Sequence, residues 1–109
     1  MIRAAVLALG LSVATSAWAT VQTVTLHCEA VYQPARSTWT RVVDIDMDQQ
    51  RVRAVRIDGV PVYTFAIHGT WILTALDNER IQIDTAAQQW QSDFRGLARA
   101  QGRCERAPA

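Results

Sequence analysis

Apolar and polar residues alternate along most of this chain, in short runs that turns interrupt. From Thr23 to Tyr32 every second residue is apolar, and a second alternating run extends from Trp39 to Met47. A period of two is typical of a β-strand that buries one face. Pro34 separates the two runs, because proline removes a donor from a strand ladder. We expect strands at 23–32, 39–48, 51–57, 63–68, 71–76, 80–84 and 90–95.

Turn signals lie between these runs, and no long amphipathic helix stands out. Asp58-Gly59 is the strongest hairpin signal in the chain. After Gly96, residues 97–101 fit either a strand or one helical turn. About seven short strands with turns between them predict an all-β fold, a small antiparallel meander curled into a barrel or into two packed sheets.

The first nineteen residues have the layout of a secretory signal peptide. Arg3 precedes an apolar run from Ala4 to Ala14, and Ala17 and Ala19 form a small-x-small ending. The run is too short to cross a membrane, which needs roughly 20 residues. We therefore expect cleavage after Ala19, export to the periplasm or beyond the cell, and a single domain at 20–109 with no stable membrane anchor.

Two cysteines, Cys28 and Cys104, lie near opposite ends of the expected domain. A domain of this size buries a limited share of its surface and gains from a covalent link. Closing a loop of this length contributes on the order of 4 kcal/mol in the chain-entropy model. The CxxC spacing of redox and metal pairs is missing, so a structural disulfide is predicted.

The charge balance argues against nucleic acid as a partner. The full chain has a formal net charge of +1, and Arg3 leaves with the expected signal peptide. Capture of nucleic acid or of an anionic membrane needs a basic excess, which the mature chain lacks.

Three alternating carboxylates, Asp44, Asp46 and Asp48, invite a calcium interpretation. Alternate positions on a strand are nearly 7 Å apart, however, which is too far for one ion. If Gln49 and Gln50 form the turn, Asp48 lies opposite Arg51 and Asp46 opposite Arg53, on the face away from the one that holds Trp39, Arg41, Val43, Ile45 and Met47. We expect a solvated face paired with arginines and no metal.

Catalytic residues are not apparent. His27 and His68 are the two histidines, and neither lies in a nucleophile motif such as GxSxG or HExxH. His27 shares its face with Glu29, and His68 precedes Gly69 at a strand end. We expect surface or strand-end histidines, no cofactor and no enzymatic activity.

Four arginines near the end of the chain are the best candidate surface for a partner. They are Arg95, Arg99, Arg103 and Arg106. If this stretch were helical, they would form a basic stripe that could bind carboxylate or phosphate groups. A solvated strand edge is nevertheless favoured over this partner surface.

Five aromatic residues could instead wall a cavity inside a barrel. They are Trp39, Trp71, Trp90, Tyr63 and Phe65. Barrels of eight or fewer strands usually have interiors filled by side chains. Core packing is therefore favoured over a ligand cavity.

The overall outline resembles that of the bacterial periplasmic lysozyme inhibitors, which it matches in its signal peptide, small size, disulfide and β-meander. In the C-type-lysozyme inhibitors the inhibitory segment is similar to Ser-Gly-x-x-Tyr, which this sequence lacks, so no site residue transfers. The sequence predicts a non-catalytic envelope protein that binds a partner protein or an envelope component through loops or a strand edge. A carrier of a lipid or hydrophobic metabolite and a lysozyme-inhibitor-like protein are the alternatives.

Overall fold

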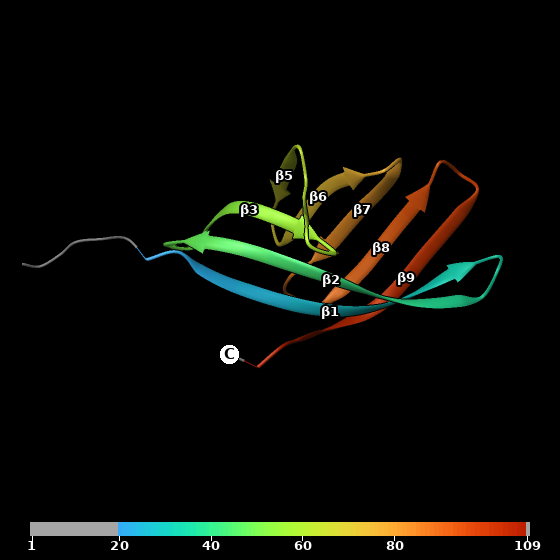
Figure 1. Ribbon diagram of the computed structural model, residues 1–109, viewed down its shortest axis with the longest axis horizontal. Coiled ribbons are helices and arrows are strands. Elements are labelled where there is room, and N and C mark those ends of the chain that lie inside the picture. The colour runs from blue at the N-terminus through green and yellow to red at the C-terminus, as the bar shows by residue number, and fades with distance from the viewer. Residues whose placement is uncertain (1–19, 109) are drawn as a thin grey trace, which may run out of the picture.

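The computed structural model describes residues 20–108 and shows one curled antiparallel sheet (Figure 1). Its strands are β1 (Gln22–Gln33), β2 (Ser37–Asp48), β3 (Arg51–Ile57), β4 (Val60–Pro61), β5 (Phe65–His68), β6 (Trp71–Leu76), β7 (Glu79–Asp84), β8 (Gln89–Phe94) and β9 (Ala98–Arg106). The all-β meander is confirmed. The expected number of about seven strands is wrong, because the described residues form nine.

The two additional strands are β4 and β9. Only two residues long, β4 lies at a sheet edge, where the missing donor of Pro61 does no harm. The stretch after Gly96 that fitted strand or helix belongs to β9, a strand of nine residues. It pairs on both sides, with β1 and with β8, and these two ladders favour the strand.

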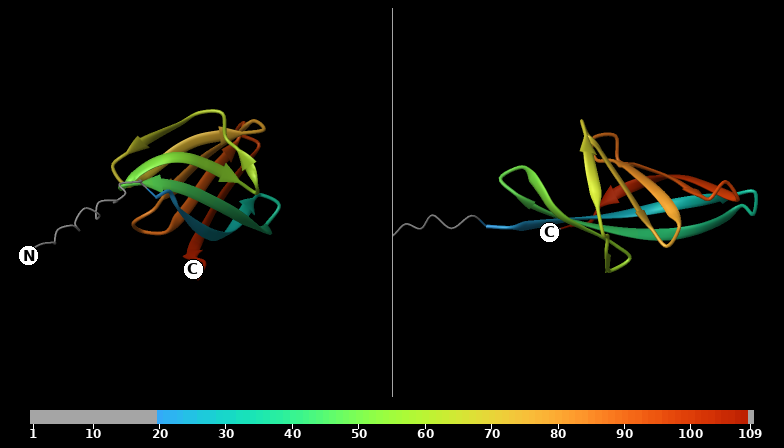
Figure 2. Two further views of the ribbon diagram at one scale, coloured as in Figure 1. Left: turned by 60° about the vertical axis from the view of Figure 1, so that its left-hand side comes forward. Right: turned by 90° about the horizontal axis from the view of Figure 1, so that it is seen from above.

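Each pair of neighbouring strands in the sheet is also consecutive along the chain, except for the central pair of β1 and β9. The order is β4-β3-β2-β1-β9-β8-β7-β6-β5, so β1 pairs with β9 and the edges are β4 and β5. The sheet curls like a half-barrel, and the segment 62–64 runs from one edge to the other (Figures 1 and 2). Residues on the concave face thus come together from strands far apart in sequence.

Several connections are tight two-residue turns. Gln49-Gln50, Asp58-Gly59 and Asp77-Asn78 all have positive φ at both positions. This conformation matches the twist of antiparallel hairpins and favours Asn, Asp and Gly. The hairpin expected at Asp58-Gly59 is confirmed, and it leads into the short edge strand β4.

The core fills the concave side of the sheet. Its buried apolar residues are Leu26, Cys28, Ala30, Val43, Ile45, Val55, Ile57, Ile72, Ile81, Ile83, Trp90, Ala100 and Cys104. They alternate with exposed residues along β1, β7 and β8, as expected for strands with one covered face. Each fully buried leucine, isoleucine or valine side chain contributes roughly 1.5 to 3 kcal/mol to folding.

Gly102 on β9 lets the central strands approach closely. It pairs with Ala30 on one side and with Trp90 on the other. A Cβ atom at this position would lie 1.7 Å from the backbone oxygen of Glu29. Any other residue would force β1 and β9 apart.

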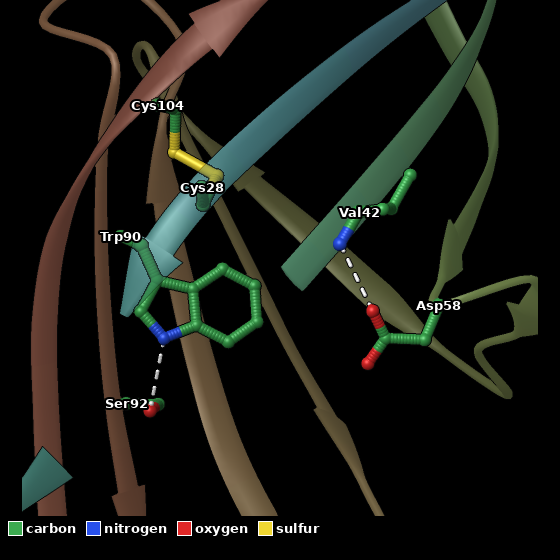
Figure 3. Close-up of a disulfide and its surroundings, with 6 residues drawn as sticks. All are labelled: Cys28, Val42, Asp58, Trp90, Ser92 and Cys104. Carbon is green, nitrogen blue, oxygen red and sulfur yellow. Dashed lines mark hydrogen bonds between the residues drawn. A yellow bond between two sulfur atoms is a disulfide. The ribbon is translucent and has the colours of Figure 1, made fainter. Parts of the chain in front are cut away.

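The disulfide joins the two central strands. Cys28 on β1 lies directly opposite Cys104 on β9, and both are buried (Figure 3). The predicted bond is confirmed. It links residues that are 76 positions apart and holds together β1 and β9, the one pair among the described strands that is not formed by neighbours along the chain.

A β-bulge in β3 changes the register expected for Asp44, Asp46 and Asp48, which we call the acidic row. Asp48 does pair with Arg51, but the register shifts between Asp46 and Met47, so Asp46 lies opposite Ala54 and not Arg53. The extra residue is Arg53, as expected for a bulge.

Arginines still neutralise the acidic row after the shift. Arg56 binds both oxygens of Asp46, at 2.8 and 3.0 Å, and Arg53 binds Asp48 at 3.2 Å. The hydrogen bonds from Arg56 and from the Thr23 hydroxyl lower the pKa of Asp46 to about 2. The row is therefore a set of cross-strand ion pairs on the convex face of the sheet.

Candidate functional site

One charged side chain of β2 points to the concave face, in line with the core residues Val43 and Ile45. This residue is Arg41, and its side chain is only 12 % exposed. A guanidinium group in such a place needs carboxylate and hydroxyl partners, because burying an unpaired charge costs several kcal/mol.

Two strands and a turn supply those partners. The Nη1 atom of Arg41 donates to the Tyr32 hydroxyl of β1 and to Glu79 Oε1 of β7, the latter at 2.9 Å. Arg41 Nε donates to Asp58 Oδ2 at 2.7 Å. The Tyr32 hydroxyl in turn donates to Glu79 Oε2. We call Tyr32, Arg41, Asp58 and Glu79 the polar cluster.

Asp58 has a second role in the turn after β3. Its Oδ1 atom accepts from the backbone N–H of Val42 at 2.9 Å (Figure 3). The N–H of Asp58 donates to the Val42 carbonyl at 2.7 Å. The turn therefore ends the β2–β3 ladder and holds the carboxylate beside Arg41.

The hydrogen bonds of the polar cluster keep Glu79 ionised. Burial raises the pKa of the Glu79 carboxyl, but the hydrogen bonds from Tyr32 and Arg41 lower it by more, and the resulting pKa lies below the ordinary value. Burial, together with the hydrogen bond to Glu79, raises the pKa of the Tyr32 hydroxyl. At neutral pH the Arg41 cation therefore lies beside an ionised Glu79 and the neutral phenol of Tyr32.

The indole ring of Trp90 lies beneath the guanidinium group of Arg41. The guanidinium carbon of Arg41 lies 4.9 Å from the centre of a Trp90 ring, in cation–π geometry. The indole N–H donates to Ser92 Oγ at 3.0 Å, so the buried ring has no unpaired donor (Figure 3). The Trp90 ring and the carboxylates of Asp58 and Glu79 together fix the orientation of the guanidinium.

An open cleft of about 520 Å³ lies over this cluster. It is lined by Tyr32, Ala35, Ser37, Trp39, Arg41, Asp58, Glu79, Phe94 and Ala98. Trp39 is 63 % exposed, and Phe94 and the nearby Leu97 are exposed as well. The cleft therefore combines aromatic walls with fixed charges at its base.

The chemistry of the cleft suits binding. Its groups are phenol, guanidinium, carboxylate and aromatic rings, and both described histidines lie elsewhere. Within residues 20–108, no group of three or more His, Cys, Asp or Glu side chains is placed to hold a metal ion. The side chains of the cleft can donate and accept hydrogen bonds and can stack on a ligand.

The four candidate arginines do not form one stripe. Arg99 and Arg103 lie on β9 with side chains on the convex face, opposite Asp93 and Glu29. Arg95 occupies the β8–β9 turn with a φ of 56°, and Arg106 ends β9. The strand conformation of β9 spreads them over different parts of the surface.

The five aromatic residues do not meet around one cavity either. Trp90 is fully buried and Phe65 packs against the core, whereas Tyr63 is 99 % exposed. Trp39 lines the cleft described above, and Trp71 lines a different cavity near the opposite end of the half-barrel.

This second cavity has a volume of about 340 Å³ and a largely aliphatic wall. Its lining residues are Val24, Leu26, Ile45, Met47, Gln50, Val52, Ile67, Gly69, Thr70, Trp71, Ile72, Thr85, Gln88 and Arg106. Arg106 is its one charged lining residue.

Sequence reasoning missed the polar cluster, although one signal was present. Arg41 interrupts an otherwise apolar face of its strand, and a charged residue at an inward position predicts buried partners. The partners themselves come from β1, β7 and the β3–β4 turn, and local patterns cannot place these together.

The chain matches no protein-family model, and comparisons with curated proteins and with solved structures likewise give no match. In the part of the chain that the structure covers, no helix is long and apolar enough to span a membrane. The expected signal peptide, residues 1–19, lies outside the described residues.

Proposed function

We propose that this protein is an exported, non-catalytic binding protein that receives an exposed loop or side chain of a partner protein in the cleft over the polar cluster. The observation that carries the proposal is the exposed Trp39 beside the fixed guanidinium of Arg41. Tryptophan, tyrosine and arginine dominate the energetic centres of protein interfaces, and all three types line this cleft.

The surroundings of the cleft support a protein partner over a small molecule. The exposed apolar residues Phe94 and Leu97 lie at the end of β8 and in the turn that follows it, and Phe94 lines the cleft. Contiguous exposed apolar groups with a polar rim are typical of protein-binding surfaces. Arg36 and Arg95, in the adjacent turns, supply such a rim.

The disulfide supports an oxidising compartment as the place of action. Such bonds persist in the periplasm and outside the cell and are rare in a reducing cytosol. The same export is predicted by the N-terminal sequence.

The test compares partner capture by matched variants of the oxidised protein. Trp39→Ala removes the exposed ring of the cleft, and Tyr63→Ala removes a fully exposed ring that does not line it. We expect the wild type and Tyr63→Ala to retain the same periplasmic protein in pull-down experiments, and Trp39→Ala to lose it. Equal capture by all three proteins would contradict the proposal.

Purified C-type lysozyme is the first individual partner to test, because the outline of the chain resembles that of the lysozyme inhibitors. Inhibition that disappears in Trp39→Ala would identify the enzyme class that the cleft binds. An unaffected lysozyme would leave the resemblance at the level of architecture.

The aliphatic cavity supports a second candidate function, the binding of an apolar chain with an anionic head. The lining of the cavity places Arg106 beside an otherwise uncharged wall, and its volume lies in the range of small-molecule sites. A brominated fatty acid should quench the fluorescence of Trp71, which lines this cavity, and Arg106→Gln should weaken its binding. Quenching that persists unchanged in Trp71→Phe would exclude this cavity as the site.

A further inference from the structure

The first half of β2 has an unpaired edge. β3 pairs only with residues Val43 to Asp48 of β2, and on that side no described strand continues the ladder along Ser37 to Val42. The β1–β2 hairpin therefore runs on beyond the end of β3, as Figures 1 and 2 show.

The backbone groups on this edge can be assigned from the Asp58 turn. The N–H and the carbonyl of Val42 both bind Asp58, so they point away from β1. Because these directions alternate along a strand, the N–H and carbonyl groups of Thr40 and Thr38 point the same way. Two residues thus offer two donors and two acceptors on an open edge.

This edge lacks the features that usually protect a strand edge. Exposed edges are normally blunted by proline, by charged side chains or by short length. β4 follows this rule with its two residues and Pro61. The segment Ser37-Thr38-Trp39-Thr40 is instead uncharged, exposed and rich in residues that favour strands.

The sequence of the edge is complementary to itself. In an antiparallel pair of two such edges centred on Trp39, Thr38 of each copy lies opposite Thr40 of the other. Both residues present their donor and acceptor toward the partner, so this register forms two complete hydrogen-bonded pairs. Trp39 then faces Trp39 of the second copy at a position without hydrogen bonds, where side chains approach most closely.

Charge is complementary in the same register. Arg36 of one copy lies at the level of Val42 of the other, where the partly exposed Asp58 carboxylate lies. Arg36 makes no ion pair within the described residues.

We propose that the protein forms a symmetric dimer in which the β2 edges of two copies pair through Thr38 and Thr40 with Trp39 stacked on Trp39. The inference rests on the strand edge and not on the function proposed above. The dimer also changes the surroundings of the cleft, because Trp39 of the second copy lies beside the open side of each cleft.

The first experiment measures the molar mass of the oxidised protein by light scattering and sedimentation across a range of concentrations. We expect a dimer whose amide hydrogens at Thr38 and Thr40 exchange more slowly as the concentration rises. A monomer at the highest soluble concentration would overturn the proposal.

Variants at Thr40 test the backbone pairing. Thr40→Pro removes the outward donor without touching the bonds to β1, and we expect dimerisation to weaken on the order of tenfold or more, since two hydrogen bonds per dimer are lost. Thr40→Val keeps the backbone donor and should dimerise like the wild type. Equal dimerisation of the proline variant would contradict the assigned edge.

A charge exchange at Trp39 keeps the proposal testable even if the proline variant does not fold. Trp39→Glu and Trp39→Lys each place like charges directly opposite one another in the symmetric register, so each alone should be monomeric. Mixing the two should restore a heterodimer. Dimers of either variant alone, or no heterodimer in the mixture, would refute the register. Partner capture can fail while these dimer experiments succeed, so the two proposals are tested separately.

Discussion

At the scale of single residues, the unusual position is Arg41, a cation among the apolar residues of the concave face. Its guanidinium is held by Tyr32, Asp58 and Glu79 and rests on Trp90. Replacing a buried ion pair by apolar residues of similar volume often leaves the free energy of unfolding unchanged or higher. We expect the charges of the polar cluster to act in the binding proposed for the cleft.

Replacement of Glu79 tests the polar cluster. The side chain of Glu79 is 11 % exposed and accepts from both Tyr32 and Arg41. We expect Glu79→Gln to lower the free energy of unfolding at neutral pH by about 1 to 3 kcal/mol, because one partner of a buried charged bond is lost. Urea unfolding measures this difference.

The difference should depend on pH in a defined direction. The pKa of Glu79 is lowered in the folded protein from an ordinary value of 4.5. A carboxyl of this kind contributes stability above the unfolded pKa and loses it as the pH falls through the folded pKa. The gap between wild type and Glu79→Gln should therefore shrink below about pH 4.5. A constant gap would contradict the assignment, and Glu105→Gln, at an exposed position on β9, serves as the control.

At the scale of elements, the sequence predicts where the strands lie more accurately than it predicts which residues pair across them. Period-two patterns predicted most strands, and Asp58-Gly59 predicted its hairpin. The bulge at Arg53 was not predicted, because charged and apolar residues alternate there without a glycine to mark it. The short pattern of β9 was ambiguous, since its two ladders come from β1 and β8.

Asp58, in the turn between β3 and β4, both stabilises that turn and binds Arg41 in the cleft. Asp58→Ala removes the partner of Arg41 Nε, the acceptor for the Val42 N–H and a residue that tolerates positive φ. We expect a loss of about 1 to 2 kcal/mol in urea unfolding. Asp58→Asn keeps the turn and the acceptor and should lose less. Equal losses in both variants would mean that the charge alone matters.

At the scale of the whole molecule, the sheet consists of two meanders joined by a single strand pair, β1 with β9, which we call the seam. Strands β1 to β4 form one group and β5 to β9 the other, and the ladder between β1 and β9 joins them. The sequence predicted the disulfide from the number and spacing of its cysteines. It did not predict that the bond lies in the middle of the sheet, because strand order depends on which edges meet in space.

Removal of the disulfide tests how much the seam relies on the covalent link. In the chain-entropy model, the Cys28→Ala/Cys104→Ala protein should lose about 4 kcal/mol of unfolding free energy, measured in guanidinium chloride against the oxidised wild type. The same denaturation with a reductant should bring the wild type to a similar midpoint. Unchanged stability in the double variant would show that the β1–β9 ladder holds without the bond.

The pairing of β1 with β9 also sets an order of assembly. During synthesis, β9 emerges after the other eight described strands, so one side of β1 has no partner until 76 residues have followed Cys28. Contacts so distant in sequence form late and slowly. Until β9 arrives, the unpaired edge of β1 can pair with a wrong strand, and the disulfide can close only after Cys104 has been synthesised.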